Sequence, residues 1–259
     1  MKLHSPFRLR LLLLAISVFA VPGWSESAAP VSKPRPASSG AIVIGFVGGF
    51  VRHDNARHGP VLLAQRIRQS SMSDAYVQVF ENRHRKSAYR AILRALDTNH
   101  DGILSAQEKI NARIVLYGQS WGASAAVLLA RDLWRQKIPV KLTVQVDSVA
   151  KFWQDDSIIP QNVAEAVNYF QPHGLIHGRP AITAADPSST RILGNYLVDY
   201  RKNPVACSGH SWFDLVTPSH AQSECDTKLW SKIEDLVWQS LGTSPSGAMV
   251  NLQSGLAPQ

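Results

Sequence analysis

The chain has 259 residues, of which 45% are hydrophobic and 18% charged. This composition is typical of a globular protein with a full core and excludes a disordered chain. The formal charge of +8 comes from 27 Lys and Arg against 19 Asp and Glu. Because these basic residues are scattered, with one short group at 83–86, the charge does not indicate a nucleic-acid partner.

The first 29 residues have the pattern of a secretory signal peptide. Met1–Arg10 contains basic residues, Leu11–Val21 is an uncharged and mostly apolar run, and small residues follow up to Ala29. The alternative is an uncleaved anchor helix, but spanning a bilayer takes about 20 apolar residues. We therefore expect an exported protein, periplasmic or secreted, with no membrane span in its mature chain.

Apolar runs alternate with helical periodicities between residues 41 and 241. Strands are predicted at Ala41–Phe46, Tyr76–Phe80, Arg113–Tyr117, Val140–Val146 and Ala166–Phe170. Helices are predicted at Asn55–Gln69, Lys86–Leu96, Ala123–Gln136 and Asp226–Leu241. This alternation favours one α/β domain, with a mostly parallel sheet covered by helices on both faces. Residues 30–40 and 242–259 are expected to be a flexible lead-in and a flexible tail.

Ser120 is the leading candidate for a nucleophile. It is the serine of Gly-Gln-Ser-Trp-Gly, residues 118–122, which connects the apolar run Ile114–Tyr117 to the helix-forming run Ala123–Ala130. A G-x-S-x-G turn between a strand and a helix lifts the serine hydroxyl above the sheet, and the helix N-terminus then faces developing negative charge. In this context the pattern favours a nucleophile over an ordinary glycine-rich turn.

With this turn, the Gly-rich segment Gly45–Phe50 and the order of elements, the chain resembles the α/β-hydrolase superfamily of lipase- and esterase-like serine hydrolases. The resemblance covers most of residues 40–241. It implies that an acid and a histidine follow the serine in chain order. Asp147 stands where the next strand is predicted to end, beside the serine-bearing strand, and is the expected acid. Asp186 and Asp214 are the alternatives.

His220 is the expected base, because the superfamily places its histidine in a loop shortly before the final helix. His210 is the second candidate. Cys207 and Cys225 flank His220 and are expected to form a disulfide in an oxidising compartment, which would limit the movement of this loop. Two free thiols are the alternative. The remaining downstream histidines are His173 and His177.

The resemblance also implies an oxyanion hole made of two backbone N–H groups. One is that of Trp121, and the other is that of Phe50, with Gly49 next to it. This segment departs from the superfamily's usual His-Gly. Aromatic residues expected near the cleft, where they either line an acyl pocket or belong to the core, are Phe46, Phe50, Trp121, Trp153, Trp212 and Phe213.

Residues 97–108 match the calcium loop D-x-[DN]-x-[DN]-G-x5-E at every required position and resemble an EF-hand or dockerin loop. The expected ligands are the side chains of Asp97, Asn99 and Asp101, the carbonyl of Ile103, a water on Ser105 and the carboxylate of Glu108. The alternative is a solvated acidic loop. Since the loop precedes the strand whose far end carries the serine, we expect a structural calcium ion, about 15–20 Å from the nucleophile.

These features predict an exported serine hydrolase that cleaves an acyl bond through a Ser-His-Asp triad and an acyl-enzyme. The expected substrate is a small-molecule or lipid-like carboxylic ester. Alternatives are a peptidase or thioesterase of the same fold, and a catalytically inactive, calcium-stabilised binding protein. Calcium is the only cofactor expected, and no organic cofactor is.

Overall fold

The computed structural model describes residues 40–70, 74–207 and 217–242. The expected signal peptide lies outside this part of the chain, as do the expected lead-in except for Gly40 and the expected tail except for Gly242. Four residues named above also lie outside it: His210, Trp212, Phe213 and Asp214.

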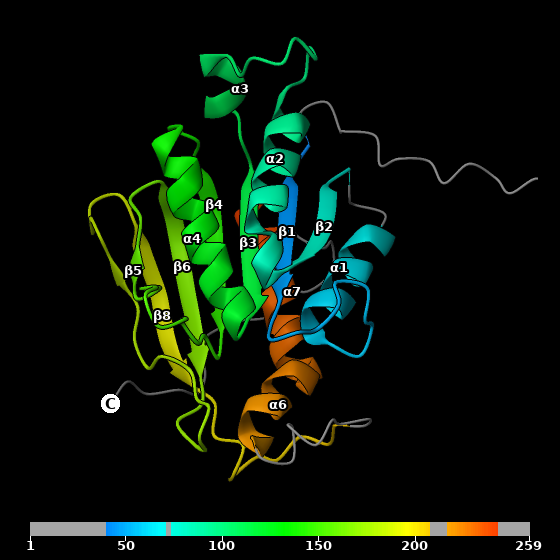
Figure 1. Cartoon of the computed structure of the whole chain (residues 1–259), viewed down its shortest axis with the longest axis vertical. Helices are drawn as coiled ribbons and strands as arrows, with labels where there is room; N and C mark the ends of the chain where they lie inside the picture. Colours follow the sequence, from blue (N-terminus) through cyan, green and yellow to red (C-terminus); the bar gives the residue numbers. More distant parts are fainter. Residues whose placement is uncertain (1–39, 71–73, 208–216, 243–259) are drawn as a thin grey trace, which may run out of the picture. The chain divides into compact units, whose positions relative to one another are not determined.

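A six-stranded parallel sheet forms the centre of the described part, with the strand order β2-β1-β3-β4-β6-β8 (Figure 1). Its strands are β1 (Ile42–Val47), β2 (Tyr76–Glu81), β3 (Ile114–Gln119), β4 (Val140–Val146), β6 (Val163–Phe170) and β8 (Arg191–Leu197). Two short strands, β5 (Ile158–Ile159) and β7 (Thr183–Ala184), pair separately. The expected α/β class with a mostly parallel sheet is confirmed.

Helices cover both faces of this sheet. The helices of the described part are α1 (Gly59–Gln69), the single 3₁₀ turn η1 (Asn82–His84), α2 (Arg85–Leu96), α3 (Ala106–Ile110), α4 (Trp121–Arg135), α6 (Pro218–Cys225) and α7 (Thr227–Ser240). Side chains alternate between the faces along a strand, so Ile42, Ile44 and Phe46 of β1 pack with α2 and α4. Val43 and Val47 pack with α1 and α7 on the other face.

Two sequence-based boundaries are wrong in ways that affect the site. Strand β1 continues to Val47, so Phe46 is a fully buried core residue and not a candidate for lining a pocket. Helix α1 begins at Gly59 and not at Asn55, because His58 is extended and Pro60 occupies the first turn. Pro is favoured in the first turn of a helix, because the N–H that it lacks would have no partner within the helix there.

Two elements near the carboxyl-terminal part of the sheet were not predicted. Strand β8 lies at the edge of the sheet and most of its side chains are partly or fully exposed, so it has no apolar run to reveal it. Helix α6 buries polar residues such as Ser219, His220 and Ser223, so it lacks an apolar stripe. His220 therefore lies on a helix, and its expected place in a loop is wrong.

All six strands run in the same direction, which places their carboxyl ends at one edge of the sheet. Ser120 and Asp147 follow the adjacent strands β3 and β4 and so share this edge. Helix α3 and the loop before it lie at the opposite edge (Figure 1). None of the helices in the described ranges combines the length and apolar character needed to cross a bilayer.

Candidate active site

Ser120 occupies a sharp turn between β3 and α4. Its backbone has φ +56° and ψ −128°, a conformation that residues other than glycine rarely adopt. A Cβ on Gly118 would lie 2.4 Å from the Gly122 carbonyl, and one on Gly122 would lie 2.4 Å from the carbonyl oxygen of Phe46. Glycine is therefore required on both sides of the serine, because backbones pass in direct contact there. The Ser120 N–H donates to the Val146 carbonyl at 2.9 Å, which ties the turn to β4.

Asp147 follows β4 directly and is 1% exposed. Its carboxylate accepts hydrogen bonds from the backbone N–H of Gln171 (3.1 Å), the side-chain amide of Gln171 (3.0 Å) and the backbone N–H of Gly178 (2.5 Å). The fourth partner is Nδ1 of His220, at 2.6 Å. These bonds to fixed amides stabilise the negative charge and orient the carboxylate towards the histidine.

His220 lies on α6 between the acid and the serine and is 7% exposed. Its Nδ1 is 2.6 Å from Asp147 Oδ2, and its Nε2 is 3.0 Å from Ser120 Oγ. Because the carboxylate requires a donor, Nδ1 carries the proton of the neutral ring and Nε2 accepts from the serine hydroxyl. The structure thus brings the three expected residues into one hydrogen-bonded line.

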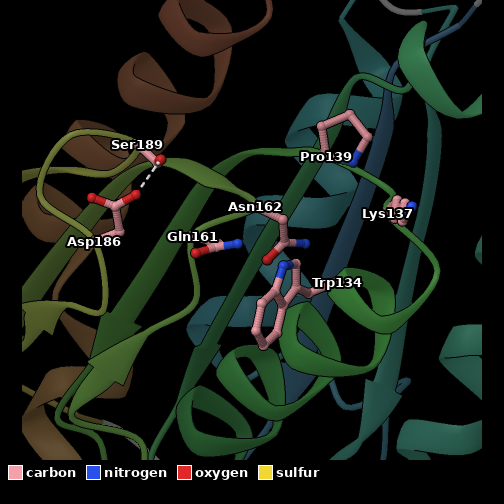
Figure 2. A pocket seen from close by; sticks show the side chains of 7 residues that line it. All are labelled: Trp134, Lys137, Pro139, Gln161, Asn162, Asp186 and Ser189. Carbon is pink, nitrogen blue, oxygen red and sulfur yellow. Dashed lines mark hydrogen bonds between the residues drawn. The ribbon is translucent and has the colours of Figure 1, made fainter.

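The alternative acid Asp186 lies away from this line. It bonds to Ser188 and Ser189 and lines a pocket of about 330 Å³, together with residues that precede β4 and β6 (Figure 2). This pocket is therefore at the amino edge of the sheet, opposite Ser120. The full lining is Trp134, Lys137, Pro139, Gln161, Asn162, Asp186 and Ser189.

The two other described downstream histidines also have partners elsewhere. His173 Nε2 lies 3.3 Å from Asp199, and His177 is exposed with its Nδ1 3.2 Å from the carbonyl of Gly174. Neither has a contact with Ser120 in the described part of the chain. Among the described histidines, His220 is the one whose ring contacts both an acid and the serine.

Gln119, which sequence reasoning did not single out, supports α6. It is fully buried, and its Nε2 donates to Ser223 Oγ at 3.3 Å and lies 3.3 Å from His220 Nε2. Ser223 Oγ donates in turn to the carbonyl of His220 at 2.7 Å. A pair between His58 and Glu224 joins the start of α1 to the same helix. The contacts of Gln119 and of His58 join segments about 100 or more residues apart, so only the position of Gln119 inside the turn was visible in the sequence.

The expected disulfide between Cys207 and Cys225 is present, with the two Cα atoms 5.5 Å apart. Cys225 is the last residue of α6, so the bond attaches the helix that carries His220 to the chain that follows β8. The disulfide constrains the histidine as expected, but through a helix and not through a loop.

The loop after β1 passes directly against the serine. A Cβ on Gly48 would lie 2.8 Å from the Cβ of Ser120, so this backbone permits no side chain. Val51 N–H donates to the Gly48 carbonyl at 3.2 Å, which closes a turn over residues 48–51. Gly49 within that turn has φ +44°, the left-handed region that favours glycine. The expected oxyanion segment therefore lies beside the nucleophile.

The aromatic residues expected at the cleft have different positions. Phe50 is 85% exposed, and its ring packs edge-on against that of Trp121 with centroids 5.7 Å apart. Trp153, in the loop after β4, is 84% exposed. Phe50 and Trp153 are therefore surface residues and Trp121 is partly buried, whereas Phe46 belongs to the core.

The Asp97–Glu108 loop forms an exposed turn between α2 and α3. Gly102 has φ +80°, and its N–H donates to Asp97 Oδ2 at 3.0 Å. The N–H groups of Asp101 and Ile103 donate to side-chain oxygens two residues earlier in the chain. Asp97 Oδ1 is buried and has no hydrogen-bond partner within the described segments. Oxygen donors of this kind fit the preference of Ca²⁺.

Glu108 accepts hydrogen bonds from Ser105 and Thr98. These bonds, first that from the Ser105 N–H, lower the pKa of Glu108 to about 2. No group of three or more His, Cys, Asp and Glu side chains in residues 40–70, 74–207 and 217–242 is arranged to hold a metal ion. To bind calcium, the Glu108 carboxylate would have to give up these hydrogen bonds and coordinate the ion instead.

No family model matches the sequence, and no curated protein matches it. Among solved structures, a cutinase-like protein from Cryptococcus sp. is 14% identical over 81% of this chain and 98% of its own, with a TM-score of 0.39. RedJ, a thioesterase of the prodiginine pathway in Streptomyces coelicolor, is 13% identical over 76% and 96%, with a TM-score of 0.39. An acetylxylan esterase is 11% identical over 79% and 100%, with a TM-score of 0.38. With identities and scores this low, the basis for a function is the geometry of the site itself.

Proposed function

We propose that this protein is a serine hydrolase that cleaves acyl bonds, with carboxylic esters as its main substrates. The observation that carries the proposal is the line from Asp147 through His220 to Ser120, with contacts of 2.6 and 3.0 Å. These residues come from three separate elements and meet at the carboxyl edge of the sheet. This edge is where ligands bind in open α/β sheets.

In the proposed reaction, the Ser120 hydroxyl attacks the acyl carbonyl while His220 Nε2 takes its proton. Asp147 holds the Nδ1–H and stabilises the imidazolium that forms. His220 then returns the proton to the leaving alkoxide, and an alcohol departs from an acyl-enzyme. Water, deprotonated by the same histidine, attacks the acyl-enzyme and regenerates the serine.

Negative charge on the carbonyl oxygen needs two fixed donors during these steps. We assign one to the N–H of Trp121, at the first position of α4, where the helix N-terminus favours an anion. We assign the other to the N–H of Phe50, with that of Gly49 next to it, in the turn that lies against Ser120. Gly48 supports this assignment, since its lack of a side chain lets the turn approach the serine.

Two features favour a small-molecule or lipid-like ester over a peptide. The exposed ring of Phe50 and the partly buried ring of Trp121 offer an apolar surface beside the serine for an acyl chain. Peptides often bind by pairing with a free sheet edge. Strand β3, which leads to Ser120, is paired with β1 and β4 on its two sides. Thioesters remain an alternative that kinetic comparison of matched oxygen and sulfur esters would decide.

We also propose that the Asp97–Glu108 loop binds one structural calcium ion and that the protein is exported. Asp97, Asn99 and Asp101, the carbonyl of Ile103, a water on Ser105 and Glu108 would hold the ion. The buried Asp97 oxygen without a partner supports this. The disulfide is compatible with an oxidising compartment.

Fluorophosphonate labelling tests the hydrolase proposal. Wild-type protein and Ser124→Ala should label, and Ser120→Ala should not. Ser124 is a suitable control because it lies in the first turns of α4, the helix that follows Ser120. It is fully buried, and its hydroxyl has no hydrogen-bond partner in the described structure. Folded wild-type protein that neither labels nor hydrolyses p-nitrophenyl butyrate would refute the proposal and favour a binding protein.

A further inference from the structure

Lys151 places a positive charge next to the turn that carries the serine. It lies in the loop after β4, and this loop is held to the turn by a hydrogen bond from the Val149 N–H to the Ser120 carbonyl, at 3.3 Å. The Lys151 ammonium is 5.1 Å from the ring centre of Trp121, the residue that follows the serine. The charge therefore stands beside the ring of the residue whose backbone N–H is assigned to the oxyanion.

Both partners of this ammonium are neutral. Nζ donates to Asn82 Oδ1 at 3.0 Å, and its other neighbour is the face of the Trp121 ring. Asn82 is 7% exposed, and its Nδ2 donates to the carbonyl of Gly49 at 2.6 Å, which turns its oxygen towards the lysine. Within the part of the chain that the structure describes, Lys151 has no ion pair.

The acidic groups nearest to Lys151 in the chain, and the one next to Asn82, have other partners. Asp147 bonds to His220, and Asp155 accepts hydrogen bonds from the N–H and the hydroxyl of Ser157. Glu81, which precedes Asn82, is 6% exposed and pairs with Arg83 at 2.5 Å. Asp156, in the same loop as Lys151, is fully buried and pairs with Arg179 at 2.6 Å. The ammonium is thus positioned and partly buried without a carboxylate to neutralise it.

We propose that Lys151 binds a negatively charged oxygen group of the substrate, so that the preferred esters carry a carboxylate or a phosphate near the scissile bond. This inference rests on the proposed function, because it concerns the specificity of the same site. A partly buried cation gains more from an anion than an exposed one, since less of the attraction is screened by water. Asn82 and Trp121 hold the ammonium in place before the substrate binds, which lowers the entropy lost on binding.

Matched pairs of esters test this specificity. p-Nitrophenyl hemisuccinate and p-nitrophenyl butyrate differ by a carboxylate on the acyl side. 1-Butyrylglycerol 3-phosphate and 1-butyrylglycerol differ by a phosphate on the alcohol side. We expect wild-type protein to have a higher kcat/KM for the charged member of at least one pair. In Lys151→Met this charged-to-neutral ratio should fall about tenfold, mainly through KM, as expected for one charge-assisted hydrogen bond.

Two further variants make the result specific. Lys151→Arg keeps the charge and should retain most of the preference. Lys141→Met removes an exposed lysine near the start of β4, the strand that precedes the Lys151 loop. It should leave the charged-to-neutral ratio unchanged. No preference in the wild-type protein would overturn the proposal. So would an equal loss on both members of a pair in Lys151→Met, because Lys151 would then only support the Asn82–Gly49 contact.

A binding measurement separates this inference from the proposed catalysis. Calorimetry with Ser120→Ala should show tighter binding of the preferred charged ester than of its neutral counterpart. Adding Lys151→Met should weaken only the charged ester, about tenfold. If wild-type protein hydrolysed no ester while this difference persisted, the proposed function would fail and the anion site would stand. Equal binding of both esters would overturn the anion site, whatever the activity.

Discussion

Gln171 donates two hydrogen bonds to the carboxylate of Asp147, one from its backbone at 3.1 Å and one from its side-chain amide at 3.0 Å. The two residues follow the neighbouring strands β6 and β4, whose parallel register places Tyr169 opposite Val146. The orientation of the acid is therefore set by sheet pairing before any substrate binds. This arrangement orients the Asp147 carboxylate for its 2.6 Å contact with His220.

Replacing Gln171 by Ala should lower kcat about tenfold and leave KM nearly unchanged. The lost amide bond is one to a charged group, typically worth about 1.5–3 kcal/mol, and it orients a residue that acts on the transition state through His220. Steady-state kinetics on p-nitrophenyl butyrate measures the effect. Gln145→Ala is the matched control, because Gln145 is also a fully buried glutamine but bonds to the carbonyl of Asp156. Equal losses in both variants would contradict a positioning role for Gln171.

Asp147→Asn should reduce kcat by a factor of about 10³–10⁴, since an amide no longer requires a proton on His220 Nδ1 and the ring can adopt the wrong tautomer. The substitution preserves size, so the melting temperature and substrate binding should change little compared with kcat. Circular dichroism and kinetics on the same preparation would check both. A variant that keeps more than a tenth of wild-type kcat would show that Asp147 is not the acid.

Replacing both Cys207 and Cys225 by Ser should reduce the free energy of unfolding by about 3 kcal/mol, the typical effect of a disulfide that closes a loop of this length. The sequence separation is 18 residues. Activity should be lost at lower denaturant concentration than the global unfolding of the sheet, because the bond constrains the helix that carries His220. Denaturant titrations followed by fluorescence and by activity would reveal the two transitions. Coincident transitions in the variant would argue against a local effect.

The Glu108 carboxylate should stabilise α3 at neutral pH and lose this effect only in strong acid. Its pKa is lowered to about 2 from an ordinary 4.5, first by the Ser105 N–H and then by the Thr98 hydroxyl. A depressed pKa in the folded state means that the contribution is complete above about pH 4.5 and declines as the pH falls towards 2. Hydrogen exchange of the α3 amides against pH would follow this loss in calcium-free protein, and Glu108→Gln should flatten the dependence.

Calcium should raise the melting temperature of the wild-type protein, and chelation should lower it without changing KM, since the loop and the serine lie at opposite edges of the sheet. Asp97→Asn combined with Asp101→Asn should remove the response. Asp186→Asn is a control, since this partly exposed carboxylate lies elsewhere and accepts hydrogen bonds from Ser188 and Ser189. A melting temperature of the wild-type protein that does not change when calcium is added or removed would refute the structural ion.

Much of the fold follows from local signals. The inner strands β1, β3 and β4 are buried on both faces and read as apolar runs, and α7 carries a clear apolar stripe. Strand β8 and helix α6 escaped prediction because one is a partly exposed edge and the other buries polar side chains. A pattern of hydrophobicity reports only elements whose burial is apolar.

For the site, the sequence by itself determined that Ser120 is the candidate nucleophile, because a turn this sharp demands the flanking glycines that the pattern contains. It also pointed to Asp147 and His220 through their order in the chain, while Asp186, Asp214 and His210 stayed open as alternatives. Only the tertiary structure decided that Asp147 and His220 meet, and that Gln119, Gln171 and Asn82 hold the site together. These contacts join residues that are 24 to about 100 positions apart in the chain. They depend on strand register and on the placement of helices, which leave no periodic pattern in the sequence.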